Sequence, residues 1–173
     1  TEEKGLWDAM EAVAIAAGRG LPITLQVAGD FPAKADQERF AELKESLARR
    51  HGLTSDWVHH AGFVGGKEKR RFLEGSDALC FPTFYPADRF GLGAAEALAF
   101  GIPPVTTDWR MLPDLMGLAG LPVSPVRDPE ALADALIAAI GRDEPAQLRQ
   151  AFLDHFTDTA HLDALVRGLL EDE

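Results

Sequence analysis

The sequence has little of several things that often define a protein's class. It contains one cysteine, Cys80, which excludes an internal disulfide and suits a reducing compartment such as the cytoplasm. Its longest apolar runs, such as residues 12–17, are far too short to span a bilayer. Residues 1–4 also lack the basic-then-apolar order of a signal peptide. We therefore expect a cytoplasmic protein.

Basic residues are also scarce. The 173 residues include 17 lysines and arginines against 28 aspartates and glutamates, a formal net charge of −11. Nucleic-acid binding normally needs a basic face, so we expect no nucleic-acid partner. Any phosphate ligand must be held by a local electropositive pocket. The length and the 46% hydrophobic content predict one globular domain, residues 1–173.

Metal-binding patterns are missing as well. His59 and His60 are adjacent, so on a strand they point to opposite faces and cannot form one chelate. The other histidines have no helpful neighbours, and no Asp-x-Asp pattern ends a predicted strand. We therefore expect no metal site and no cofactor.

Helical and strand patterns alternate along the chain. Helices are predicted over residues 6–19, 34–50, 67–74, from about 91 onward, 129–140, 145–156 and 159–170. Strands are predicted over residues 23–28, 57–60, 77–81, 104–106 and 121–124, with a loop around 111–113 and a disordered acidic tail at 171–173. The pattern predicts an α/β, Rossmann-like parallel sheet with helices on both faces and a helical segment from about residue 129. Ligands of such sheets bind at the carboxyl ends of the strands.

The most informative segment is residues 81–101, which predict a strand, a loop, a turn at Gly91 and a helix. Backbone amides in such a turn and the dipole of the following helix favour an anion such as a phosphate. Asp88 and Glu96 lie on either side of the turn, where they could bind hydroxyl groups next to that phosphate. The pattern indicates a phosphorylated ligand that contains a sugar.

Five short motifs, in order, carry a resemblance to a known family. They are Glu3-Lys4-Gly5-Leu6, Val27-Ala28-Gly29-Asp30, Ala61-Gly62-Phe63-Val64, the strand 77–81 with Pro82-Thr83, and Asp88-x-Phe-Gly-Leu-x3-Glu96-Ala-Leu-Ala-x-Gly-x-Pro. Together they resemble the carboxyl-terminal, donor-binding half of GT-B glycosyltransferases, most closely the retaining family 4 enzymes. The resemblance covers essentially the whole chain.

The resemblance implies a role for each matching residue. Glu96 would accept hydrogen bonds from the ribose of a nucleoside-diphosphate sugar, and Asp88 would contact hydroxyls of the transferred sugar. The remaining donor-binding residues would be Lys4, Gly62, Phe63, Val64, Phe90, Gly91 and Leu92. Lys4 and the amides near Gly91 would contact the diphosphate, and the loop at Phe63 would contact the base. Catalysis in this fold needs no bound metal.

Each assignment has a structural alternative. Glu96 could be a solvated helix carboxylate, although its apolar neighbours favour a function, and Asp88 could cap a turn. Phe63 is equally well explained by packing at a strand end. Arg89 is more simply explained as a solvated arginine than as a phosphate ligand. Cys80 is more simply explained as a buried apolar side chain than as a nucleophile.

Two departures from the family matter. The usual Glu-x7-Glu is Asp88-x7-Glu96 here, which shortens the first side chain by one methylene. These enzymes are also about twice this length, so the acceptor-binding half and the strand expected before Lys4 are missing. We therefore expect a sheet that is split, filled by another chain, or distorted near Lys4, with possible self-association through it.

The resemblance predicts transfer of a hexose from a UDP-, GDP- or ADP-sugar to a hydroxyl acceptor with retention. The 173-residue chain alone is expected to bind the donor weakly and to transfer nothing, because the missing half would bind the acceptor. The alternative is a non-catalytic nucleotide-sugar binding or assembly module that works with a partner chain. A GT-B-like epimerase or phosphorylase is a third reading, for which no cofactor-binding lysine motif is present.

Overall fold

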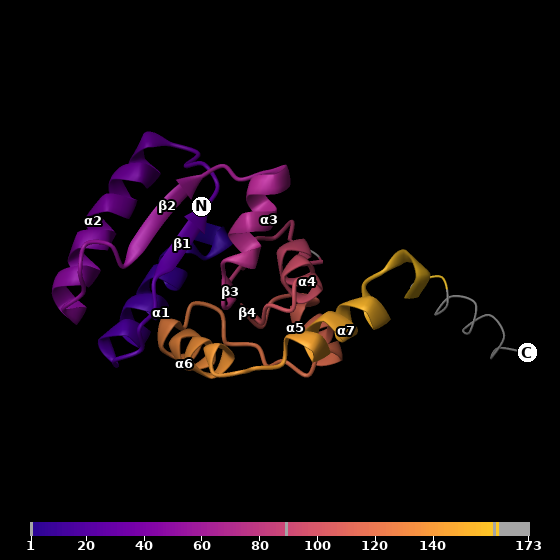
Figure 1. The fold of residues 1–173 in the computed structure, drawn as a ribbon. Coiled ribbons are helices and arrows are strands. Elements are labelled where there is room, and N and C mark those ends of the chain that lie inside the picture. Colours follow the sequence, from indigo (N-terminus) through magenta and orange to yellow (C-terminus); the bar gives the residue numbers. More distant parts are fainter. Residues whose placement is uncertain (1, 89, 161, 163–173) are drawn as a thin grey trace, which may run out of the picture.

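The computed structural model describes residues 2–88, 90–160 and 162, which alternate between helices and strands (Figure 1). The helical elements are η1 (Glu2–Lys4), α1 (Leu6–Gly18), α2 (Lys34–His51), α3 (Gly66–Glu74), α4 (Leu92–Ala99), α5 (Leu112–Leu118), α6 (Pro129–Ile140) and α7 (Pro145–His155). The strands are β1 (Leu25–Ala28), β2 (Val58–Gly62), β3 (Leu79–Phe81) and β4 (Pro104–Thr106). The α/β prediction is confirmed.

Most predicted elements are present, and several have the predicted bounds. Strand β4 and helix α6 begin and end where the sequence places them. Helix α6 begins as its sequence indicates, because Asp128 accepts a hydrogen bond from the Ala131 amide and Pro129 follows it. Strands β1 and β3 each begin two residues later than predicted.

Two predictions near residues 111–124 are wrong. The loop expected around residues 111–113 is the start of helix α5, because Pro113 lies in the first turn, where a missing N–H costs nothing. The strand expected at 121–124 is reduced to one bridge between Ser124 and Thr107. Pro122 lies within this segment and Pro125 directly follows it; neither can donate to a ladder, so only a short contact with the sheet forms.

Some predictions fall on residues that the structure does not describe. The helix predicted at 159–170 lies largely outside the described residues, and the acidic tail 171–173 and Arg89 lie wholly outside them. Within the described part of the chain, no helix has the length and apolar character needed to cross a membrane.

The strands form two separate parallel pairs. Strand β1 pairs with β2, Leu25 opposite Val58, and β3 pairs with β4, Leu79 opposite Pro104. No hydrogen-bonded ladder joins the two pairs among the described residues, and Figure 1 shows no strand between them. The predicted incomplete sheet is therefore present in its split form. The gap also leaves β3, expected to be buried, only half-buried.

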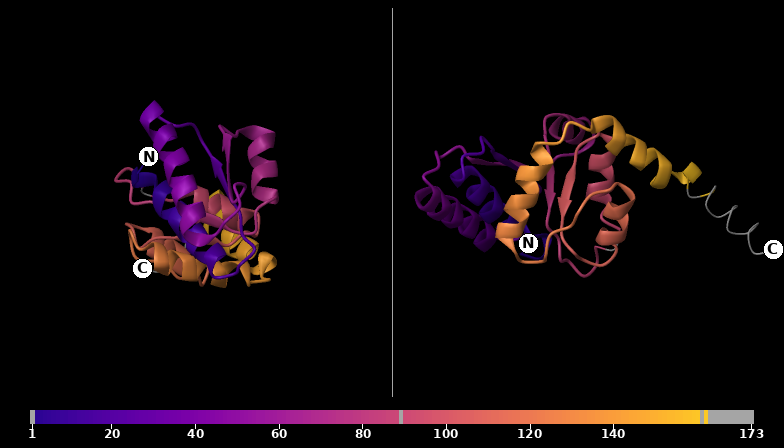
Figure 2. Two further views of the ribbon diagram at one scale, coloured as in Figure 1. Left: turned by 90° about the vertical axis from the view of Figure 1, so that its left-hand side faces the viewer. Right: turned by 90° about the horizontal axis from the view of Figure 1, so that it is seen from below.

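Helix α1 holds the two strand pairs together. Apart from Trp7 and Ala9, its buried side chains are Met10, Ala12, Val13, Ala14 and Ala16, which are small or slender. They belong to one apolar cluster with side chains of α2, β2, β4 and α6, and α1 packs directly on α2 and α6. A second cluster joins α4, α5 and α7, which lie at the opposite end of the molecule from α2 (Figures 1 and 2).

A close backbone approach fixes the start of α1. Gly5 has a left-handed backbone with φ of 75°, and a Cβ atom there would lie 2.1 Å from the carbonyl oxygen of Pro82. Only glycine therefore fits between η1 and the segment after β3. The same contact places Glu3 O within 2.8 Å of the Phe84 amide, which donates to it.

We expect Gly5→Ala to lower the free energy of unfolding by about 3 kcal/mol or more, from left-handed strain plus overpacking. Gly52→Ala is the matched control, because Gly52 has a φ of 67° but open space around its Cα. The free energy of unfolding of that variant should fall by only about 1 kcal/mol, because only the left-handed backbone strain applies there. Urea unfolding of both variants tests this, and equal losses would contradict the close approach at Gly5.

Candidate functional site

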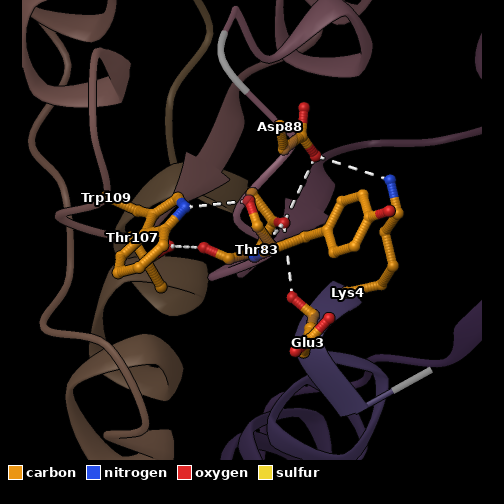
Figure 3. Close-up of polar contacts among 7 residues, drawn as sticks. Glu3, Lys4, Thr83, Asp88, Thr107 and Trp109 are labelled. Carbon is orange, nitrogen blue, oxygen red and sulfur yellow. Dashed lines mark hydrogen bonds and ion pairs between the residues drawn. The ribbon is translucent and has the colours of Figure 1, made fainter.

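The candidate site lies at the carboxyl ends of β3 and β4, where the loops after both strands meet η1 (Figure 3). Thr83 lies in the loop after β3, and Thr107 directly follows β4. The Thr107 hydroxyl donates to the carbonyl oxygen of Thr83 at 2.6 Å. Trp109 Nε1 donates to the carbonyl oxygen of Tyr85 at 3.0 Å, so the β4 loop holds the β3 loop by two bonds.

Thr83 is the buried centre of this network. Its hydroxyl accepts from the Tyr85 amide at 3.2 Å and lies 3.2 Å from Asp88 Oδ2 and 3.4 Å from Glu3 O. A hydroxyl has one proton, so it donates to only one of these two oxygens at a time. Sequence reasoning gave Thr83 no role beyond its place in a motif, because these bonds depend on segments distant in sequence.

The structure brings together Asp88 and Lys4, which the sequence assigns to different parts of the donor. Lys4 Nζ lies 3.6 Å from Asp88 Oδ2, and the Asp88 side chain is only 14% exposed, against 52% for Lys4. The ammonium group also lies 4.8 Å from the centre of the Tyr85 ring. Lys4 is thus positioned by a carboxylate and an aromatic face, and half of it remains open to a ligand.

Glu96 has a basic partner that sequence reasoning missed. Lys69, on α3, donates to Glu96 Oε1 at 2.6 Å, and both side chains are 44% exposed. The sequence gave a weak signal for this pair, because a carboxylate among the apolar residues of α4 needs a counter-charge. Nothing in its spacing identified α3 as the source.

The turn before α4 has the backbone that an anion site needs. Gly91 has a φ of 64°, and a Cβ there would lie 2.4 Å from Leu112 Cδ2. The first amides to donate within the turn are those of Ala94 and Ala95, both to Gly91 O. The amides of Leu92 and Gly93 precede these bonds and have no acceptor within the helix.

Side chains around this turn face outward. Phe90 is 41% exposed and Leu92 is 68% exposed. Phe90 nevertheless contacts the ring of Phe156, with the two ring centroids 6.2 Å apart. Gly91 itself is buried, whereas Leu92 directly after it is exposed.

The loop after β2 is the other predicted part of the site. Gly62 has a φ of 72°, Val64 is half-buried and Phe63 is 73% exposed, so Phe63 does not pack into the core. Helix α3 begins at the end of this loop, and its Lys69 forms the ion pair with Glu96. The loop and the α4 turn are therefore linked through α3.

The other candidate residues stay apart from this site. His60 lies 2.6 Å from the carbonyl oxygen of Gly29 and contacts the Phe31 ring, while His59 is exposed. Burial raises the pKa of the Cys80 thiol to about 12, which keeps it neutral and weakly nucleophilic. No group of three His, Cys, Asp or Glu side chains suited to a metal ion occurs in the described ranges.

The arrangement of charges suits an anion flanked by hydroxyl groups. Asp88 and Glu96, each with a lysine partner, flank in sequence the N-terminus of α4, whose first amides have no acceptor within the helix. Carboxylates accept hydrogen bonds from sugar hydroxyls, whereas lysines and amides stabilise phosphate oxygens.

The fold is that of one half of a GT-B glycosyltransferase. One similar structure is the crystallised C-terminal domain of a glycosyl transferase group 1 family protein from Francisella tularensis. The match covers 91% of this chain and 82% of the Francisella chain, with a TM-score of 0.75 and 17% sequence identity. Another is Anabaena HepE, whose structure was solved in complex with UDP and glucose. The match covers all of this chain and 46% of the HepE chain, with a TM-score of 0.70 and 18% sequence identity.

Residues 1–142 match the family described as Glycosyl transferases group 1, and the chain belongs to this family. The O-antigen chain mannosyltransferase B of Escherichia coli is 26% identical over 100 residues, 58% of this chain. The MMP alpha-(1->4)-mannosyltransferase of Mycolicibacterium hassiacum is 33% identical over 108 residues, 61% of this chain. The matched parts are 26% and 25% of those two proteins.

Two neighbouring threonines, Thr106 at the end of β4 and Thr107 directly after it, provide a test of the network. The hydroxyl of Thr107 holds the β3 loop, whereas the buried hydroxyl of Thr106 has no hydrogen-bond partner among the described residues. Thr107→Val should lower the free energy of unfolding by about 1 to 2 kcal/mol, and Thr106→Val should leave it unchanged or raise it. Chemical denaturation of both variants measures this, and the reverse order would contradict the assigned network.

Proposed function

We propose that residues 1–173 form one donor-binding domain, with a helical segment from about residue 129, of a glycosyltransferase that uses a nucleoside-diphosphate sugar. The observation that carries this proposal is the pair of lysine–carboxylate contacts, Lys4–Asp88 and Lys69–Glu96, whose carboxylates flank in sequence the first amides of α4. The UDP and glucose in the HepE structure support the same ligand class.

The diphosphate binds at the turn before α4. The amides of Leu92 and Gly93 and the positive end of the helix face its oxygens, and Lys4 approaches from η1. Charge develops on this diphosphate as the bond to the sugar breaks. Amides that are already fixed in place stabilise that charge without reorganising, which lowers the barrier.

The two carboxylates orient the two ends of the donor. Glu96 accepts from the ribose hydroxyls through the oxygen that Lys69 leaves free, and Asp88 accepts from hydroxyls of the transferred sugar. Because Asp88 is mostly buried and held by Thr83 and Lys4, it has a fixed direction. Fixed contacts at both ends direct the anomeric carbon toward an acceptor.

The proposed reaction transfers a hexose to a hydroxyl acceptor with retention of configuration and needs no metal. Its acceptor site belongs to the part of the relatives that this chain does not span. The two named mannosyltransferases support a hexose, and the family supports glycosyl transfer. The 173-residue chain is accordingly proposed to bind the donor without transferring it.

A thermal-shift panel of UDP-, GDP- and ADP-sugars tests the proposal. One nucleotide class should raise the melting temperature, and Glu96→Ala should abolish that shift. Glu45→Ala is the matched control, because Glu45 is an exposed α2 carboxylate that pairs with Arg49. It should respond as the wild type does. Stabilisation by none of the three classes, or equal stabilisation of both variants, would contradict the proposed site.

Lys69→Met should weaken binding of the same nucleotide by roughly tenfold, the loss expected for one charge-assisted hydrogen bond. Without the ammonium group, Glu96 is unrestrained and its charge repels the diphosphate. Lys67→Met is the matched control, because Lys67 is an exposed lysine on the same helix. Calorimetric dissociation constants measure both, and equal affinities for the two variants would exclude a role for Lys69.

A further inference from the structure

A groove separates the two strand pairs along their whole length. Its wider part is a cavity of about 470 Å³ lined by residues 25–32 and 79–82, together with Lys4 and the start of α1. Its narrower part, about 190 Å³, is lined by residues 22–26 and 75–80. Since the carboxyl ends of β1 and β3 share one part and their amino ends share the other, the two strands run in the same direction.

Backbone groups of β1 face this groove. In a parallel sheet, the backbone N–H and C=O groups of one residue point to the neighbouring strand on one side, and those of the next residue point to the opposite side. The amides of Leu25 and Gly29 donate to Trp57 O and Gly62 O on the β2 side. The N–H and C=O groups of Gln26 and Ala28 therefore point to the other side, which is the groove.

Strand β3 presents the same pattern from the opposite wall. The Leu79 amide donates to Pro103 O on the β4 side, so the backbone groups of Cys80 point toward the groove. The described residues supply no ladder between β1 and β3, so these groups are left for another partner. Gln26 and Ala28 are exposed and Cys80 is half-buried, so these edges are open templates for pairing with another strand.

The remaining walls of the groove are mainly apolar. Leu6 and Ala9 of α1 line it, as does Phe72 of α3, and Lys4 and Asp30 lie at the carboxyl end. A strand between two helical layers is buried on both faces, so its sequence must be nearly continuously apolar.

We propose that this groove is the binding site for one extended, apolar peptide strand that runs parallel to β1 and β3. The strand joins the two pairs into one five-stranded parallel sheet, bonding to Gln26 and Ala28 on one side and to Cys80 on the other. Two facing rows of backbone donors and acceptors are matched by another backbone, which neither a sugar nor a lipid supplies. This inference is independent of the proposed donor site.

The test is amide hydrogen exchange of the 173-residue chain with and without a peptide. The probe is acetylated Lys-Val-Val-Ile-Val-Val-Lys amide. Its control is the same peptide N-methylated at the three central residues, which keeps the apolar surface but removes backbone donors. The unmodified peptide should slow exchange of the Gln26, Ala28 and Cys80 amides at least tenfold, and the methylated peptide should slow it less than twofold.

Three results would overturn the proposal. The first is strong protection of these amides in the free monomer, which would mean that the groove is already closed. The second is equal protection by both peptides, which would mean apolar filling without a ladder. The third is protection that rises with protein concentration and accompanies dimerisation, which would make a second copy the occupant. Alkylation of Cys80, slowed by the unmodified peptide alone, is an independent supporting result.

Discussion

The close approach of the Gly5 backbone to Pro82 is the contact on which the rest of the site depends. A side chain at position 5 would occupy the space of the Pro82 carbonyl, so η1 can lie against the β3 loop only through glycine. That contact lets Glu3 O accept from Phe84 and directs Lys4 toward Asp88. It also sets the start of α1, the helix whose small side chains join the two strand pairs.

The electrostatics of the site follow from the same arrangement. The chain has a net charge of −11, yet each carboxylate near the α4 turn has a lysine within 4 Å. These local pairs remove the repulsion that an anionic ligand would otherwise meet. The attraction itself then comes from fixed amides and the helix dipole, which act at short range and do not depend on the overall charge.

Local signals explain what the sequence could predict. Strand β4 and helix α6 follow from prolines and an N-cap. The expected incomplete sheet is present among the described residues as two separate strand pairs.

What was missed depends on contacts between distant segments. The Thr83 network needs η1, the β3 loop and the β4 loop together, and the Lys69–Glu96 pair needs α3 beside α4. Helix α5 was missed for a local reason, because Pro113 was interpreted as a loop residue although it also fits a first helical turn.

The most direct test of the central claim is a map of amide chemical shifts on titration with UDP, GDP and ADP. One nucleotide should shift the amides of Gly91, Leu92 and Gly93 most, with smaller shifts in the loop of Gly62 and at Lys4. Shifts concentrated elsewhere, or no saturable shift with any nucleotide, would contradict the account of this turn as the diphosphate site.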